Sequence, residues 1–172
     1  MEIRSIQPFL DYWRNIRGRT RRVVEQIPAQ HVEWSPLADR FTLGDLARHL
    51  VTVERYMYAE TVHGRPSTYS GCGQELASGR DAVLAFMDRL HAESLDLFGR
   101  LSDEDLQRKC LTPAGTPITT WKWLRAMVEH EAHHRGQIYL MLGMLDVKTP
   151  PLFGLTAEEL QARSAATQRA VS

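Results

Sequence analysis

Apolar residues recur every three or four positions along four long segments of the chain, and this spacing limits the folds available to it. One face of an α-helix carries residues at such intervals, whereas a half-buried strand alternates apolar and polar residues. The spacing predicts amphipathic helices over residues 5–27, 42–62, 79–101 and 119–145. We therefore expect an all-α fold, a four-helix bundle that forms a single domain over residues 1–172.

Local signals mark several ends of these helices. Thr42 is followed three residues later by Asp45, the spacing of a capping box at a helix start. The same spacing between Thr156 and Glu159 predicts a short C-terminal helix over residues 157–168. These signals place helix starts directly after the two threonines.

The segments between the helices are also informative. Ser78, with Asp81 three residues on, is expected to precede the third helix. Residues 63–78 are rich in glycine, serine and proline, which is typical of a loop. Two short β-like runs flank the sequence PAG at residues 113–115, and they predict a short hairpin or loop before the fourth helix.

The charges are balanced, with 21 lysines and arginines against 21 aspartates and glutamates. Nucleic-acid binders usually carry a basic excess, so we expect no nucleic acid as a partner. Five arginines cluster in the first predicted helix, and we interpret them as a solvent-exposed face. They are Arg14, Arg17, Arg19, Arg21 and Arg22.

The sequence also indicates a location. No run approaches the 18 apolar residues of a transmembrane helix, so we expect no membrane partner. The first residues carry charges and lack the apolar segment of a signal peptide, which favours the cytoplasm. The two cysteines, Cys72 and Cys110, do not form a disulfide framework or a zinc motif. Cys72 lies in a glycine-rich stretch and is expected to be exposed but unreactive.

Three histidines lie on the predicted helices in positions that favour one shared metal site. His130 and His134 are four residues apart, so their side chains are about 40° apart around the helix axis. Such a pair can bind one metal ion, and it shares the apolar face with Met141. His49 lies on the apolar stripe of the second helix and is the candidate third ligand. The alternative for all three is a structural role in the core.

The letters HEAHH at residues 130–134 also fit H-E-x-x-H, a motif of zinc hydrolases. In that arrangement Glu131 would act as the general base for the attacking water. No histidine follows His134, so the third ligand would have to be an acid such as Glu158 or Glu159. Acids are common in the first turn of a helix for electrostatic reasons, so their presence there gives this alternative little support.

The longer run HEAHHRGQ, with the upstream His49 in ARHLVTVERY, resembles the DinB-like family of metal-dependent enzymes, which includes bacillithiol-transferase-like proteins. The resemblance covers nearly the whole chain. It implies a four-helix bundle and a homodimer. It also implies one divalent metal ion, zinc or nickel, held by His49, His130 and His134.

Family members of known activity are similar to thiol transferases. The resemblance therefore implies transfer of a low-molecular-weight thiol, as cosubstrate, to an electrophilic small molecule. One alternative is a non-catalytic metal-binding or stress-response scaffold, and the zinc hydrolase is a further one. The sequence does not identify the metal, the thiol, the electrophile or a catalytic residue.

Several neighbours of the histidines carry expectations of their own. Glu131 and His133 are expected either to hydrogen-bond to the metal ligands and fix their orientation or to lie on the surface. Arg135 points away from the site and is expected at a dimer contact or on backbone. Gly136 suggests a close helix contact or space left free near the metal. We expect Trp121 and Trp123 in the core, and an acceptor pocket lined by Met127, Gln137, Met141 and Tyr56.

Overall fold

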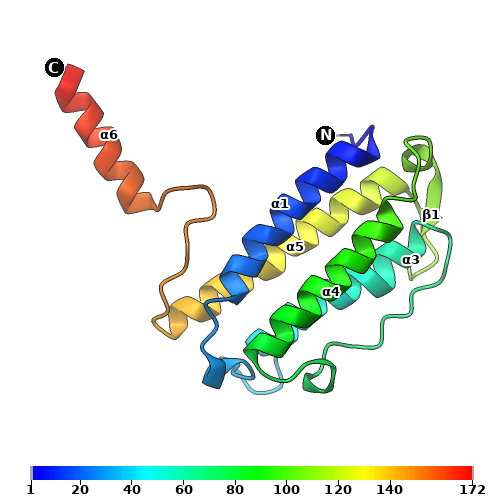
Figure 1. The fold of residues 1–172 in the computed structure, drawn as a ribbon, viewed down its shortest axis with the longest axis horizontal. Coiled ribbons are helices and arrows are strands. Elements are labelled where there is room, and N and C mark those ends of the chain that lie inside the picture. The colour runs from blue at the N-terminus through cyan, green and yellow to red at the C-terminus, as the bar shows by residue number, and fades with distance from the viewer. Residues whose placement is uncertain (1, 172) are drawn as a thin grey trace.

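A computed structural model describes residues 2–171 of the chain, and it is predominantly helical (Figure 1). The bundle consists of α1 (Ile6–Val24), α2 (Leu43–Val53), α4 (Arg80–Phe98) and α5 (Thr120–Met144). α2 continues through a π-helical segment, Glu54–Tyr58, into the short α3 (Ala59–Thr61). The predicted all-α fold is confirmed, and the predicted helix over residues 42–62 contains a π-helical interruption.

Smaller elements connect the bundle helices. The predicted hairpin is confirmed: β1 (Lys109–Leu111) pairs antiparallel with β2 (Pro117–Thr119) directly before α5. Single 3-10 turns lie at Ala29–His31, Gln74–Leu76 and Asp105–Gln107. The C-terminal helix α6 (Ala157–Val171) is longer than predicted, and Figure 1 shows it directed away from the bundle.

Both predicted capping boxes are present. The Thr42 hydroxyl accepts a hydrogen bond from the Asp45 amide at 2.9 Å, and the Asp45 carboxylate accepts one from the Thr42 amide at 3.0 Å. Thr156 and Glu159 make the same reciprocal pair at the start of α6, at 3.2 and 2.8 Å. These bonds satisfy amides that the first helical turn leaves without partners.

The expected start of the third helix at Ser78 is wrong by one residue. Gly79 precedes α4 directly, with a φ of 83° that favours glycine. The Ser78 hydroxyl accepts a hydrogen bond from the Gln74 side chain at 3.1 Å and makes no cap. The chain therefore enters α4 through the positive φ of Gly79 and not through a serine cap. The spacing of Ser78 and Asp81 gives no signal for this conformation.

The two core clusters show how the helices run. One cluster joins the C-terminal halves of α1 and α5 to the N-terminal halves of α2 and α4. The other joins the opposite halves of the same helices. Thus α1 and α5 run parallel to each other and antiparallel to α2 and α4. α2 and α4 run in the same direction, and no other long helix lies between them in the sequence. The chain must therefore return along the bundle between them, which explains the long loop of residues 63–78 (Figure 1).

A buried ionic cluster lies inside the bundle, contrary to the expected solvent exposure of all five arginines on the first helix. Arg17 is only 4% exposed. Its guanidinium lies 2.6 Å from Glu54 at the start of the π-helical segment and 3.0 Å from Glu131 on α5. Trp13 and His91 also bond to Glu54, at 2.7 and 2.8 Å. Arg17 therefore ties α1 to the two chain segments that carry the histidines.

The electrostatics of this cluster follow from burial and pairing. Burial disfavours the charged form of Glu54, but Arg17 and His91 outweigh it and hold the pKa of Glu54 below its usual value. Burial raises the pKa of Glu131, and Arg17 offsets this only in part. Arg17 thus favours the charged form of both carboxylates, although the pKa of Glu54 is lowered and that of Glu131 is raised.

Cys72 is buried, so its expected exposure is wrong. Burial raises the pKa of its thiol, which fits the unreactive role predicted for it. Trp121 and Trp123 are partly buried against the second core cluster, near the predicted core position. Among residues 2–171, no helix combines the length and apolar character needed to cross a bilayer.

Candidate metal centre

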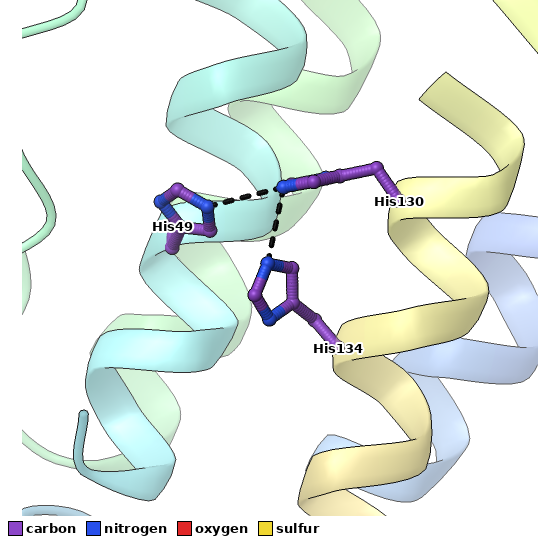
Figure 2. Close-up of side chains that lie close together, drawn as sticks. All are labelled: His49, His130 and His134. Carbon is purple, nitrogen blue, oxygen red and sulfur yellow. Dashed lines mark hydrogen bonds between the residues drawn. The ribbon is translucent and has the colours of Figure 1, made fainter. Parts of the chain in front are cut away.

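Three histidines from two facing helices meet between α2 and α5. His49 projects from α2, and His130 and His134 project from successive turns of α5 (Figure 2). Each side chain is partly buried. The predicted positions on the helix faces therefore bring all three imidazoles together, over a separation of more than 80 residues in sequence.

The distances between the ring nitrogens suit one shared metal ion. The Nε2 atom of His130 lies 3.2 Å from that of His49 and 3.1 Å from that of His134. All three atoms lie within 4.8 Å of one another. Metal–nitrogen bonds of about 2.0–2.1 Å place neighbouring ligand nitrogens about 3.0–3.4 Å apart. The spacing of the three histidines thus fits one divalent ion. Among the described residues, they form the group of side chains whose geometry could hold a metal.

The opposite nitrogens of two rings have hydrogen-bond partners that orient them. The Nδ1 atom of His134 lies 2.6 Å from the Gln137 amide oxygen, which can only accept. His134 therefore carries its proton on Nδ1, and its Nε2 lone pair faces the other histidines. The Nδ1 atom of His49 lies 2.9 Å from the Tyr69 hydroxyl. Both contacts fix imidazoles in the orientation that a metal requires.

Tyr69 is a site residue that sequence reasoning missed, because it lies in the loop of residues 63–78, which has no periodicity. Arg48, the neighbour of His49, holds this loop in place. Its guanidinium donates to the backbone carbonyls of Cys72 and Ala77, at 2.7 and 2.9 Å. The same group also pairs with Glu33 and Asp45. A fully buried arginine thus anchors the loop that supports His49.

Burial keeps the three imidazoles neutral. Burial, with a contribution from His134, lowers the pKa of His49 to about 4. Burial and the neighbouring histidines lower the pKa of His130 to about 3. The pKa of His134 is also lowered, mainly by burial. Neutral imidazoles are the form that coordinates metals, so all three are ready to bind one at neutral pH.

The other residues of the zinc-hydrolase motif do not join the cluster. Glu131 is buried in its ion pair with Arg17, on the side of α5 that packs against α1. His133 is exposed, 3.3 Å from the Gln137 amide nitrogen. Glu158 and Glu159 lie exposed on α6. The structure thus gives Glu131 a structural partner and places neither downstream acid in the histidine group.

The structure also places Arg135 and Gly136 of α5. Arg135 points away from the histidines, as expected; it is buried and donates to the Thr20 hydroxyl on α1 at 3.2 Å, so the partner observed for it is a side chain of the same chain. Gly136 is exposed, and a Cβ atom added to it would meet nothing within 4 Å. The close helix contact suggested for this glycine is therefore absent, and nothing around it requires the absence of a side chain.

Replacing Gly136 with alanine should stabilise the protein. Glycine in a helix interior costs roughly 0.5–1 kcal/mol relative to alanine, and the new methyl group would point into open space. We expect the free energy of unfolding to rise by about that amount in chemical denaturation. Gly18→Ala on α1, which also meets nothing within 4 Å, is the matched variant and should behave alike. Destabilisation by Gly136→Ala alone would reveal a close contact at this glycine.

The predicted acceptor-pocket residues divide between two places. Gln137 and Met141 line a cavity beside the histidines. Met127 is buried in the second core cluster, and Tyr56 packs against the first. Met127 and Met141, about four turns apart on α5, are both buried, yet only Met141 also lines the cavity, a difference that helix periodicity does not show.

The fold and the three converging histidines place this protein in one class, that of helical bundles with a candidate metal centre between two facing helices. Its family follows from the sequence itself, because residues 12–138 match the DinB superfamily. The chain belongs to this superfamily. The matched region contains all three clustered histidines.

Individual relatives agree with this placement. The uncharacterised protein YjoA of Bacillus subtilis strain 168 is 24% identical over 128 residues, covering 72% of this chain and 80% of YjoA. The crystal structure of YjoA has a TM-score of 0.67 at 16% identity, covering 87% of this chain and all of that one. A DinB-like protein from Bacillus cereus ATCC 10987 has a TM-score of 0.73 at 18% identity, covering 86% of this chain and 97% of that one.

A further similar structure is an enzyme. The mycothiol-dependent maleylpyruvate isomerase has a TM-score of 0.63 at 14% identity. The alignment covers 77% of this chain and 60% of that enzyme. This chain therefore shares its fold with an enzyme whose activity depends on a thiol.

Proposed function

We propose that this protein is a metal-dependent enzyme that transfers a low-molecular-weight thiol to an electrophilic small molecule, with His49, His130 and His134 as the ligands of one divalent ion. The observation that carries the proposal is the convergence of three neutral imidazole Nε2 atoms within 4.8 Å. Zinc and nickel both suit three imidazole ligands. The fold shared with the mycothiol-dependent isomerase supports a thiol as cosubstrate.

The chemistry divides between the ion and the chain. A divalent ion held by three neutral ligands keeps its positive charge and would lower the pKa of a thiol beside it. Gln137 and Tyr69 orient the imidazoles that hold the ion. In the transfer itself, the thiol loses its proton to solvent and its sulfur forms a bond to the electrophilic carbon. The bond from that carbon to its leaving group breaks, and the leaving group takes the electron pair.

A turnover assay tests this proposal. The full chain, loaded with zinc or nickel, would be mixed with bacillithiol, mycothiol or glutathione and with monochlorobimane, which becomes fluorescent when a thiol displaces its chloride. We expect turnover above the rate without protein, and its loss after removal of the metal by a chelator. A chain that binds metal but turns over none of these thiols would favour the scaffold alternative.

Other expectations drawn from the sequence stay predictions. These are a homodimer, a cytoplasmic location, a role in stress response and the absence of nucleic acid as a partner.

A further inference from the structure

A cavity of about 590 Å³ lies beside the histidine cluster, between the segment that precedes α2 and the C-terminal half of α5. Its volume is in the range of small-molecule sites. The apolar residues that line it are Leu37, Phe41, Leu46, Leu140, Met141 and Met144. A space of this size lined by large apolar side chains can hold the body of an organic molecule.

The walls of the cavity contact the candidate metal centre at two points. Gln137 lines the cavity and bonds to His134 at 2.6 Å. Phe41 also lines it, and its ring centroid lies 5.4 Å from that of His49. A molecule in the cavity would therefore lie next to the residues that orient and cover two of the three imidazoles.

The exposure of the lining residues points to a ligand. Leu46 and Met141 are buried, whereas Leu140 and Met144 are 69% and 60% exposed. Leu37 and Phe41 are exposed across from them. Exposed apolar side chains gathered in one place usually mark a binding site. The two methionines have flexible, polarisable side chains that adapt to ligands of irregular shape.

The charges of the cavity restrict the ligand further. Two charged residues line it, Asp39 and Arg40, and they are adjacent and of opposite sign. Their charges offset each other, so the cavity has no net charge with which to attract a carboxylate or an amine. An uncharged apolar group is the ligand that this lining favours.

We propose that this cavity binds the aromatic or aliphatic body of an uncharged electrophile and holds it beside the histidine cluster. The proposal rests on the proposed function, since it assigns the acceptor of the thiol. It also makes a separate claim about binding, which requires neither metal nor thiol.

Equilibrium binding of N-phenyl-1-naphthylamine to the full chain tests this claim. This probe is uncharged and becomes fluorescent in apolar surroundings. The test variant is the double substitution Leu140→Asp with Met144→Asp, which places two charges at the cavity mouth. Both positions are exposed on α5, so the fold should survive. Leu160→Asp is the matched control, because Leu160 is 57% exposed on α6.

We expect the wild type and the control to bind the probe alike. The double variant should bind it at least about tenfold more weakly, because an apolar probe would cover the two new carboxylates and remove water from them. Equal binding by all three proteins would overturn the proposal. A second result would also overturn the proposal: the wild type binds no probe and forms a dimer, and the double variant is a monomer. The apolar face would then serve self-association. Probe binding lost in the variant, with no thiol turnover by the wild type, would support the cavity and contradict the proposed function.

Discussion

Replacing Arg17 with methionine should lower the free energy of unfolding by about 3–5 kcal/mol, which is the usual loss when one partner of a buried ion pair is removed. Methionine fills much of the same volume but leaves Glu54 and Glu131 without the guanidinium that pairs with both of them. Both carboxylates are 1% exposed, so water cannot replace the lost guanidinium. Urea denaturation followed by circular dichroism measures the loss.

Two further variants separate charge from packing. Arg14→Met is the matched control on α1, where Arg14 is exposed and pairs with Asp11; it should change stability by no more than about 1 kcal/mol. Adding Glu54→Gln and Glu131→Gln to Arg17→Met removes the unpaired charges and should restore much of the loss. If Arg17→Met cost no more than Arg14→Met, the buried cluster would not contribute as its geometry indicates.

Replacing His130 with alanine should reduce metal-dependent thiol turnover at least about 100-fold, to the rate without protein. Loss of a residue that only orients a metal ligand typically costs about 10–100-fold in affinity or activity, and loss of a ligand should cost more. His130 is the central member of the cluster, since its Nε2 atom lies near both other Nε2 atoms. The initial rate with monochlorobimane measures the effect, at a fixed metal concentration.

His133→Ala is the matched control for this loss. His133 lies three residues away on the same helix, but it is exposed and outside the cluster. We expect it to keep most of the activity. Comparable loss in both variants would contradict the assignment of His130 as a ligand, and would point to a general effect of removing histidines from α5.

Much of the fold could be predicted because its signals are local. The apolar spacing reports which helix faces are buried, and the capping boxes at Thr42 and Thr156 satisfy amides within one turn. The parallel arrangement of α2 and α4 has no such local signal. It is set by which helix halves pack together in the two core clusters, a property of the whole chain.

The histidines could be placed for the same geometric reason. Two of them share one face of a helix, and the third lies on an apolar stripe that must face the interior of the bundle. Their partners divide differently: Gln137 is one turn from His134, whereas Tyr69 reaches His49 from a loop that Arg48 anchors. Loop positions depend on long-range contacts, so no spacing in the sequence indicates Tyr69.

Charged residues gave the clearest error. The arginines of the first helix look alike by composition, yet Arg17 is buried and Arg14 is exposed. Arg17 lies one turn from Trp13 and one turn from Thr20, both on the inner face of α1. This position could have marked it as buried. Its partners, however, come from the π-helical segment after α2 and from α5, and the sequence does not show that these two carboxylates lie beside it.

The metal content of the protein tests the central claim most directly. Wild type and His49→Ala would be purified without chelator or histidine tag, and both would be measured by elemental analysis. The three-histidine centre predicts about one divalent ion per chain in the wild type and its loss in the variant. Full retention of the metal by His49→Ala would contradict the centre and favour a ligand downstream of His134. A wild type that holds no metal, even after zinc or nickel is added, would contradict any metal-dependent function.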